Sequence, residues 1–571
     1  MPSARPSDFV NLPFQEKLEF LYGLPARQKR DLILASPEAE RLVQSFAPDT
    51  LFYTLKEIGI ADASDLLSMA VPEQVRWLFD LDCWDKDRPN FKRVGEWVEA
   101  LSESGRKRMA EGLMELDLEL VALLLRRYLR VYRLDDPQML PDAPSDHFVQ
   151  FDEHYLIEFT RYDTLGAHIQ EFLEEAFERD YNYFAGLMEE LFWGVEAELE
   201  EQAYQFRATR LADRGFPDYF EAQDIFAYVN PQRFLEIRGT YPAPSRADRP
   251  DDLDLVPPHM APVAGDADHS LFNTALTAGF AAQGKRQLRS EMAMVSNQVL
   301  VARSVDFGDL DAVRVAVEMT HDYLNLALEH LAGGELKAAI EHLSDTHLKL
   351  LFRLGVSLTI DLRTRAEGVV TALGFTPDAS RDIGYLDSPY REALAGFLER
   401  QPRFCGALDR GGAVAMRNFR AIRDLHLSYG LLEQINTMPE LFRALLTLDI
   451  AAPGFRAAIA GHEIRLSQIL LTALARWAME RRLGIDPIEP ARLSEMRAAI
   501  MTHAKRPYDL RREFQQQVDE LLERRLDEPL RLRAAGFVNS SLNMLREELA
   551  GLDPAQTIDP RFIRAVMIRR G

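Results

Sequence analysis

The chain has 571 residues, 47% of them hydrophobic, and a formal net charge of −23. Single hydrophobic cores stop growing near roughly 250–300 residues, so this length predicts several domains. The hydrophobic content excludes disorder over the whole length. The excess of acid repels phosphate backbones, and binding to nucleic acid needs a basic patch. In the most basic stretch, 480–571, arginines alternate with acids as on a solvated helix face, so we expect no nucleic-acid partner.

Several sequence features point to a cytoplasmic protein. Two isolated cysteines, Cys83 and Cys405, exclude a disulfide framework and a cysteine-based zinc site. Residues Met1–Phe14 lack the apolar run of a secretory signal. No apolar run approaches the roughly 20 residues that span a bilayer, and acids interrupt the best one, Leu116–Leu125. We therefore expect a cytoplasmic chain without a membrane span.

Residues 1–134 predict an array of short helices. Proline suits the first turn of a helix, where its missing N–H needs no partner. Apolar residues follow at helical intervals, and paired short helices of this kind bury their faces only against neighbours. The prolines expected at helix starts are Pro25, Pro37, Pro48 and Pro72.

The same region has a recognisable rhythm, a Leu-Pro or Ser-Pro-Glu start followed by leucine pairs. In this rhythm it resembles the helical superhelix in the cytoplasmic part of bacterial magnesium transporters and in flagellar motor-switch proteins. The resemblance is confined to 1–134 and implies stacked short helices without implying an activity.

The chain then changes character. After a linker-like stretch at Asp135–Asp146, two aromatic runs flank a polar turn, so 148–159 predicts a β-hairpin. It is the only sheet that we expect. Helical periodicity resumes within a domain predicted at 147–239. Residues 240–270 are rich in proline and acids, which predicts a linker.

Two further helical domains are predicted at 271–373 and 389–571. Residues 324–343 predict an αα-hairpin, in which Gly333-Gly334 ends the first helix. The expected fold class is therefore mainly all-α. It consists of stacked short-helix hairpins followed by helical bundle domains, with one small β-hairpin near 148–159.

Three segments resemble an uncharacterised family of large, helical bacterial cytoplasmic proteins, a domain of unknown function. These segments are Glu200–Ala222, Ala312–His330 and Leu351–Leu358. The similarity extends over most of the chain. The family carries no assigned activity, so the resemblance implies a helical fold and a bacterial cytoplasmic setting without supplying chemistry.

The most pointed polar pattern lies on the helix expected at 200–213. At helical spacing an arginine and a tyrosine share a face, and forked guanidinium donors suit a carboxylate or a phosphate. The alternative is an ion-pair network that ties this helix to its neighbours. The candidate ligand-binding residues are Glu201, Tyr204, Arg207, Arg210 and Asp213.

Four histidines and their acidic neighbours form a second cluster. Helices that bind metal place ligands at i, i+3 or i, i+4. His342 and His347 are five apart and face differently, and neither lies on the line of Glu341 and Asp345, which are four apart. A site assembled between helices remains the alternative to ordinary histidines. The residues are His321, His330, His342 and His347.

Four aspartates around Trp84 form a third cluster. A calcium loop needs glycine at its sixth position and glutamate at its twelfth, and both are missing. A solvated turn is the ordinary interpretation, and a weak site for a regulatory divalent cation is the alternative. The aspartates are Asp80, Asp82, Asp85 and Asp87.

No catalytic motif is present, because the sequence lacks a Gly-x-Ser-x-Gly elbow, a P-loop and a Gly-x-Gly-x-x-Gly turn. Cationic neighbours favour a lowered thiol pKa at Cys405, and a buried structural thiol is the alternative. We expect a non-enzymatic interaction or scaffold protein that offers helical grooves to protein partners, with no cofactor and no metal. The alternative is an enzyme or small-molecule sensor with an anion-binding site on the 200–213 helix.

Overall fold

The protein is mainly α-helical. In the part of the chain that the computed structural model describes, 69% of residues are helical and there are 26 helices. Sheets there are small and antiparallel, with two or three strands each, which confirms the predicted fold class. The described residues are 9–22, 24–135, 140, 147–213, 215–241, 270–280, 282–375, 383–409, 412–459, 463–502, 508–552 and 558–569.

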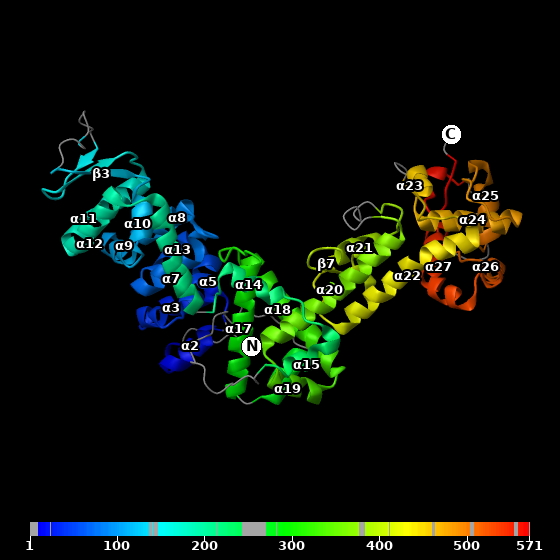
Figure 1. The fold of residues 1–571 in the computed structure, drawn as a ribbon, viewed down its shortest axis with the longest axis horizontal. Coiled ribbons are helices and arrows are strands. Elements are labelled where there is room, and N and C mark those ends of the chain that lie inside the picture. The colour runs from blue at the N-terminus through cyan, green and yellow to red at the C-terminus, as the bar shows by residue number, and fades with distance from the viewer. Residues whose placement is uncertain are drawn as a thin grey trace. The chain divides into compact units, whose positions relative to one another are not determined.

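The chain forms two compact units (Figure 1). Unit 1 comprises Met1–Ala227 and Phe234–Arg353, and unit 2 comprises Tyr228–Arg233 and Leu354–Gly571. Helix α20 (Leu348–Ala372) therefore begins in unit 1 and continues in unit 2. The five parts predicted from the sequence divide the chain more finely and stay a prediction.

The first half of unit 1 consists of short helices. Two of the four expected prolines, Pro48 and Pro72, begin helices, while Pro25 directly precedes one. Before the helix near Pro37, the Ser36 hydroxyl accepts a hydrogen bond from the backbone N–H of Glu38. The elements are α2 (Phe14–Tyr22), α3 (Ala26–Leu34), α4 (Ala39–Gln44), α5 (Pro48–Ile58), η1 (Ala61–Ala63), α6 (Ser64–Leu67), α7 (Pro72–Asp82), α8 (Phe91–Ser102), α9 (Arg106–Met114) and α10 (Leu118–Leu125).

The predicted hairpin is present, but it belongs to a larger sheet. Strands β4 (Phe148–Val149) and β5 (Tyr155–Phe159) pair antiparallel, and β3 (Leu129–Arg133) pairs with the other edge of β5. Strand β3 lies inside the region predicted to be wholly helical. Only its first three residues, Leu129, Arg130 and Val131, alternate between buried and exposed, which is too short a pattern to predict a strand.

The expectation of a single sheet is wrong. Strands β1 (Trp84–Asp85) and β2 (Arg88–Pro89) form a second hairpin in unit 1. Strands β6 (Phe404–Cys405) and β7 (Met416–Arg417) form a third small sheet in unit 2. Runs of two residues carry too little periodicity for sequence patterns to predict them.

The second half of unit 1 contains longer helices. Helix α18 ends at Gly333, whose φ of +58° is the left-handed conformation expected of a glycine C-cap. The predicted αα-hairpin, α18 and α19, is therefore confirmed. The elements are α11 (Thr164–Arg179), α12 (Tyr181–Trp193), α13 (Glu196–Asp213), α14 (Tyr219–Gln223), η2 (Asp224–Phe226), α15 (Phe234–Arg238), α16 (Leu271–Gly279), α17 (Ala282–Ala302), α18 (Leu310–Ala332) and α19 (Leu336–Asp345).

Unit 2 is built around α22, α24 and α27, which pack through apolar faces. The Asp387 carboxylate caps the first turn of α24 by accepting hydrogen bonds from the Ser467 backbone N–H and hydroxyl. The elements after α20 are α21 (Tyr390–Phe397), η6 (Gly406–Leu408), α22 (Ile422–Leu446), α23 (Pro453–Ile459), α24 (Leu466–Glu480), η7 (Pro490–Arg492), α25 (Leu493–Ile500), α26 (Arg512–Arg525), α27 (Glu528–Leu549) and η8 (Pro560–Phe562); η3 (Pro231–Arg233) precedes them in the chain.

Nearly all of the predicted 240–270 linker, from 242 to 269, lies outside the described residues. The same is true of most of the linker-like stretch predicted after residue 134. None of the helices described here combines the length and the apolar character needed to cross a membrane.

Candidate functional site

The polar helix predicted at 200–213 is the C-terminal part of α13, which packs against α10 in unit 1 (Figure 1). Its buried residues recur every four positions, so one face of the helix is covered. Arg207 belongs to that face, and Arg210 lies at its edge. The buried residues are Leu199, Ala203, Arg207 and Leu211.

Arg210 binds two carboxylates at once. Its Nε and Nη2 donate to the two Asp80 oxygens at 2.7 and 2.8 Å. Its Nη1 and Nη2 donate to the two Asp117 oxygens at 2.9 and 2.6 Å. Burial raises the pKa of Asp80, and the Arg210 guanidinium opposes that rise. Such forked pairs fix both distance and orientation, so Arg210 joins α13 to α7 and to the start of α10.

Arg207 is more deeply buried, with only 8% of its surface exposed. Its Nε donates to the backbone oxygen of Asp80 at 2.7 Å, and its Nη1 donates to that of Lys86. The guanidinium carbon lies 5.1 Å from the centre of the Trp84 ring, which is a cation–π contact. Burial lowers the pKa of Arg207 to about 10, so it remains charged at neutral pH.

The geometry of Arg210 is that of the alternative interpretation, an ion-pair network between helices, and Arg207 is held beside it by backbone oxygens and the Trp84 ring. An external anion would have to displace Asp80 or Asp117 from Arg210. Of the other candidates, Tyr204 donates to Asp218 Oδ2 at 3.5 Å, Glu201 accepts from the Gln205 amide, and Asp213 is exposed. A ligand-binding role for these five residues stays a prediction.

The acidic cluster around Trp84 supplies the network with its carboxylates. Asp80 and Asp82 are 2% and 0% exposed, so the interpretation as a solvated turn is wrong for them. Asp82 accepts hydrogen bonds from Lys56 Nζ and from Trp97 Nε1. Basic side chains from other helices satisfy these acids, which is why the fold can bury them. Two predicted clusters, on α7 and α13, are therefore one network.

The loop before α18 joins the same region. Arg93 on α8 forms a bidentate ion pair with Asp306 in this loop. Gly308 approaches Asp82 and Lys56 so closely that a Cβ atom would collide with the Asp82 carboxylate. Phe307 packs against Phe216, with ring centres 5.2 Å apart, directly before α14. The network thus fixes the loop and the turn that leads into α14.

The histidines do not converge. His321 is buried against Ser270, with Nε2 3.4 Å from the Ser270 hydroxyl, and burial lowers its pKa to about 4. His342 lies 3.3 Å from Arg238, and His347 lies 3.5 Å from Glu291. Within the described ranges, no group of three or more His, Cys, Asp or Glu is arranged to hold a metal ion.

Both cysteines are buried. Burial raises the pKa of the Cys405 thiol, and it raises that of Cys83 further above its ordinary value. The sequence had left open a lowered pKa at Cys405. The structure places that thiol in the other environment, that of a buried structural cysteine.

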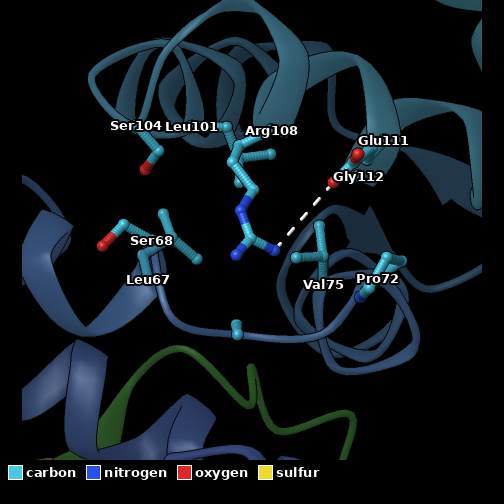
Figure 2. Close-up of a pocket in the computed structure, with 10 residues that line it drawn as sticks. Leu67, Ser68, Pro72, Val75, Leu101, Ser104, Arg108, Glu111 and Gly112 are labelled. Carbon is cyan, nitrogen blue, oxygen red and sulfur yellow. Dashed lines mark ion pairs between the residues drawn. The ribbon is translucent and has the colours of Figure 1, made fainter. Parts of the chain in front are cut away.

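A small pocket opens between α6, α7, α8 and α9 (Figure 2). The Arg108 side chain extends across it and forms an ion pair with Glu111 at 3.9 Å. The pocket has a volume of about 10 Å³, which suits roughly one water molecule and is too small for a metabolite. The lining residues are Leu67, Ser68, Ala70, Pro72, Val75, Leu101, Ser104, Arg108, Glu111 and Gly112.

The most unusual surface feature is the start of α14. Phe220 is 82% exposed and its neighbour Tyr219 is 43% exposed, although both are large aromatic residues. Their ring centres lie 5.6 Å apart, and the Asp218 carboxylate caps the helix at the Phe220 N–H. Sequence reasoning missed this pair. A signal was present, because two adjacent aromatics at the start of a five-residue helix cannot both face a core.

The family model described as "Family of unknown function (DUF6178)" matches residues 6–569. The chain belongs to the DUF6178 family. This confirms the predicted membership of an uncharacterised family, and it assigns no activity to the DUF6178 chain. Comparisons with curated proteins and with solved structures found no match.

Proposed function

We propose that this DUF6178 chain is a non-enzymatic interaction or scaffold protein of the bacterial cytoplasm, and that its partner is a protein. The observation that carries the proposal is the exposed aromatic pair at the start of α14. Aromatic side chains dominate the energetics of protein interfaces, since each buries a large area at a low cost in conformational entropy. Phe220 is 82% exposed, so a partner that covers it would bury a large apolar area.

The rigid support of this pair favours an interface over an accidental exposure. Asp218 caps α14, Gln223 at its other end donates to the backbone oxygen of Ala302, and Ala222 is fully buried. Phe216, just before the helix, packs against Phe307. A surface held in one conformation loses little entropy on binding, which strengthens the association.

The test is affinity purification of the full-length chain from a bacterial lysate, followed by mass spectrometry. We expect specific proteins to co-purify with the wild type and to be lost from the double variant Tyr219→Ser, Phe220→Ser. The matched control is Phe562→Ser, which removes a 71% exposed aromatic from unit 2. Circular dichroism and thermal unfolding must show that both variants remain folded.

Two results would overturn the proposal. One is a wild-type chain that retains no protein reproducibly at near-physiological salt. The other is a double variant that retains the same proteins as the wild type and the control.

The alternative, an enzyme or small-molecule sensor with an anion site on α13, makes a different prediction. Phosphate or a carboxylate metabolite would raise the melting temperature, and Arg207→Ala with Arg210→Ala would abolish that rise. The donors of Arg210 point to Asp80 and Asp117, so such a ligand must compete with two internal carboxylates.

A further inference from the structure

The aromatic pair follows Asp218, which Tyr204 on α13 also reaches, and we call these residues and their acidic neighbours the α13–α14 face. Tyr204 on α13 reaches Asp218 at the start of α14, and its ring centre lies 6.4 Å from that of Trp84 in β1. Nearby Asp87 and Asp218 help to raise the pKa of Tyr204, after the larger effect of burial. The residues of the face are Asp87, Tyr204, Asp218, Tyr219, Phe220 and Glu221.

We propose that the α13–α14 face binds an arginine-rich segment of the protein partner. This inference rests on the proposed interaction function and names the chemistry of what is bound. It is carried by two properties of the face, its exposed carboxylates and its exposed aromatic rings.

The charge of the face favours a basic occupant. Asp87, Asp218 and Glu221 are exposed, and within the described residues none of them forms an ion pair with Lys or Arg. Two cations share the hairpin with Asp87: Lys86, and Arg88, which lies opposite Asp85 in the pairing of β1 with β2. These exposed carboxylates, together with the net charge of −23 on the chain, favour a cationic segment over an acidic one.

The aromatic rings favour arginine over lysine. A guanidinium group stacks on aromatic faces and binds carboxylates through a planar fork, whereas an ammonium group acts as a point charge. The face presents both kinds of acceptor, the rings of Tyr219 and Phe220 beside the carboxylates of Asp218 and Glu221. The protein already uses this pairing internally, where Arg207 lies over the Trp84 ring.

Trp84 adds a second, independent observation. It is 6% exposed, and its Nε1 has no hydrogen-bond partner in the described chain. A buried donor without an acceptor is destabilising. A backbone carbonyl of a docked peptide is an acceptor of the right kind for this N–H group.

The experiment measures binding of fluorescein-labelled nine-residue peptides to the full-length chain by fluorescence anisotropy at low salt. The probes have the sequence Gly-Arg-Arg-Leu-Gly-Arg-Arg-Leu-Gly and the same sequence with lysine or glutamate in place of arginine. We expect the arginine peptide to bind at least threefold more tightly than the lysine peptide. The glutamate peptide should show no binding.

The variants separate the two sources of affinity. Tyr219→Ser with Phe220→Ser should lower the affinity for the arginine peptide at least tenfold. Asp87→Asn with Glu221→Gln should lower that affinity several-fold. The acid substitutions should also reduce the dependence of binding on salt. Glu178→Gln, which neutralises an exposed acid on α11, is the matched control and should leave binding unchanged.

Equal binding of the arginine and glutamate peptides would overturn the proposal, as would arginine-peptide binding that survives both double variants. The two proposals fail separately. If proteins co-purify in a manner that depends on Tyr219 and Phe220 but the arginine peptide does not bind, the interaction function is supported and the arginine-rich segment is excluded. Loss of both results removes both proposals.

Discussion

Two groups of buried or partly buried polar side chains in unit 1 differ in whether they find hydrogen-bond partners. The charged group on α13, Arg207 and Arg210, finds carboxylates or carbonyls at hydrogen-bond distance. The neutral group on α17, Ser296 and Asn297, is 0% and 1% exposed, and their side chains find no hydrogen-bond partner among the described residues.

The difference follows from the size of the penalty. An uncompensated buried charge costs several kcal/mol, whereas an unpaired neutral group costs about 1–3 kcal/mol. A fold can therefore tolerate Ser296 unpaired, but it must supply acids for Arg210. Four predictions test this comparison, from the largest expected effect to the smallest.

Removing Arg210 should be strongly destabilising. Arg210→Met keeps the aliphatic bulk but leaves Asp80 and Asp117 without their shared partner, with side-chain exposures of 3% and 14%. We expect the free energy of unfolding of unit 1 to fall by about 3–5 kcal/mol in denaturant titrations. The control Arg179→Met removes an exposed pair with Glu111 and should cost about 0–1 kcal/mol. Equal losses in the two variants would contradict the comparison.

Lys29 sharpens the comparison, because it is a buried charge whose compensation is poor. It is 0% exposed, donates to the Thr54 hydroxyl at 3.3 Å, and has its pKa lowered to about 8, mainly by burial. A lowered pKa means that Lys29 destabilises the fold below pH 8 and that stability rises between pH 8 and 10.5. Lys29→Met should therefore stabilise unit 1 by up to about 3 kcal/mol at pH 7.

The measurement is the melting temperature of the wild type and the Lys29→Met variant from pH 7 to pH 10. The difference between them should shrink as the pH rises, because the wild-type lysine loses its charge. A variant that is less stable than the wild type at pH 7 would show that Lys29 is well compensated.

His321 provides a pH-dependent case. Burial lowers its pKa to about 4, so the folded state favours the neutral ring. Its contribution to stability is complete above the unfolded pKa of 6.5 and is lost as the pH falls through 4. Between pH 7.5 and pH 5 we expect a loss of about 2 kcal/mol from this residue. His321→Gln should flatten the profile over that interval, and an unchanged slope would contradict the assignment.

The smallest effect concerns the hydroxyl of Ser296. Ser296→Ala removes a buried oxygen without a hydrogen-bond partner in the described chain, so stability should stay equal or rise by up to about 1 kcal/mol. The matched control is Ser428→Ala in α22, also 0% exposed, whose hydroxyl donates to the Asp424 backbone oxygen. That variant should lose about 1 kcal/mol. Similar losses at both sites in thermal unfolding would show that Ser296 has a bound partner.

Much of the fold could be predicted because it depends on near neighbours. Pro48 and Pro72 mark helix starts, Gly333 marks a helix end, and the 148–159 hairpin closes over a short turn. Strand β3 was missed because its pairing with β5, such as Leu129 with Phe159, joins residues far apart in the sequence.

The sequence predicted the two charged clusters of the candidate site, but not that they contact each other. The arginines of α13 and the aspartates of α7 stood out as charged clusters, and each suggested a ligand of its own. Arg210 meets Asp80 across 130 positions and Asp117 across 93, a pairing that no local pattern encodes. The adjacent aromatics of α14 carried a local signal, but only the structure shows that Phe220 is 82% exposed.

By itself the sequence determined where helices begin and end and which stripes are apolar, because backbone conformation responds to residues within a few positions. Only the tertiary structure decided which carboxylates bind Arg210 and which aromatic rings stay exposed. Those outcomes depend on the packing of distant helices, which brings charges together and leaves Phe220 uncovered.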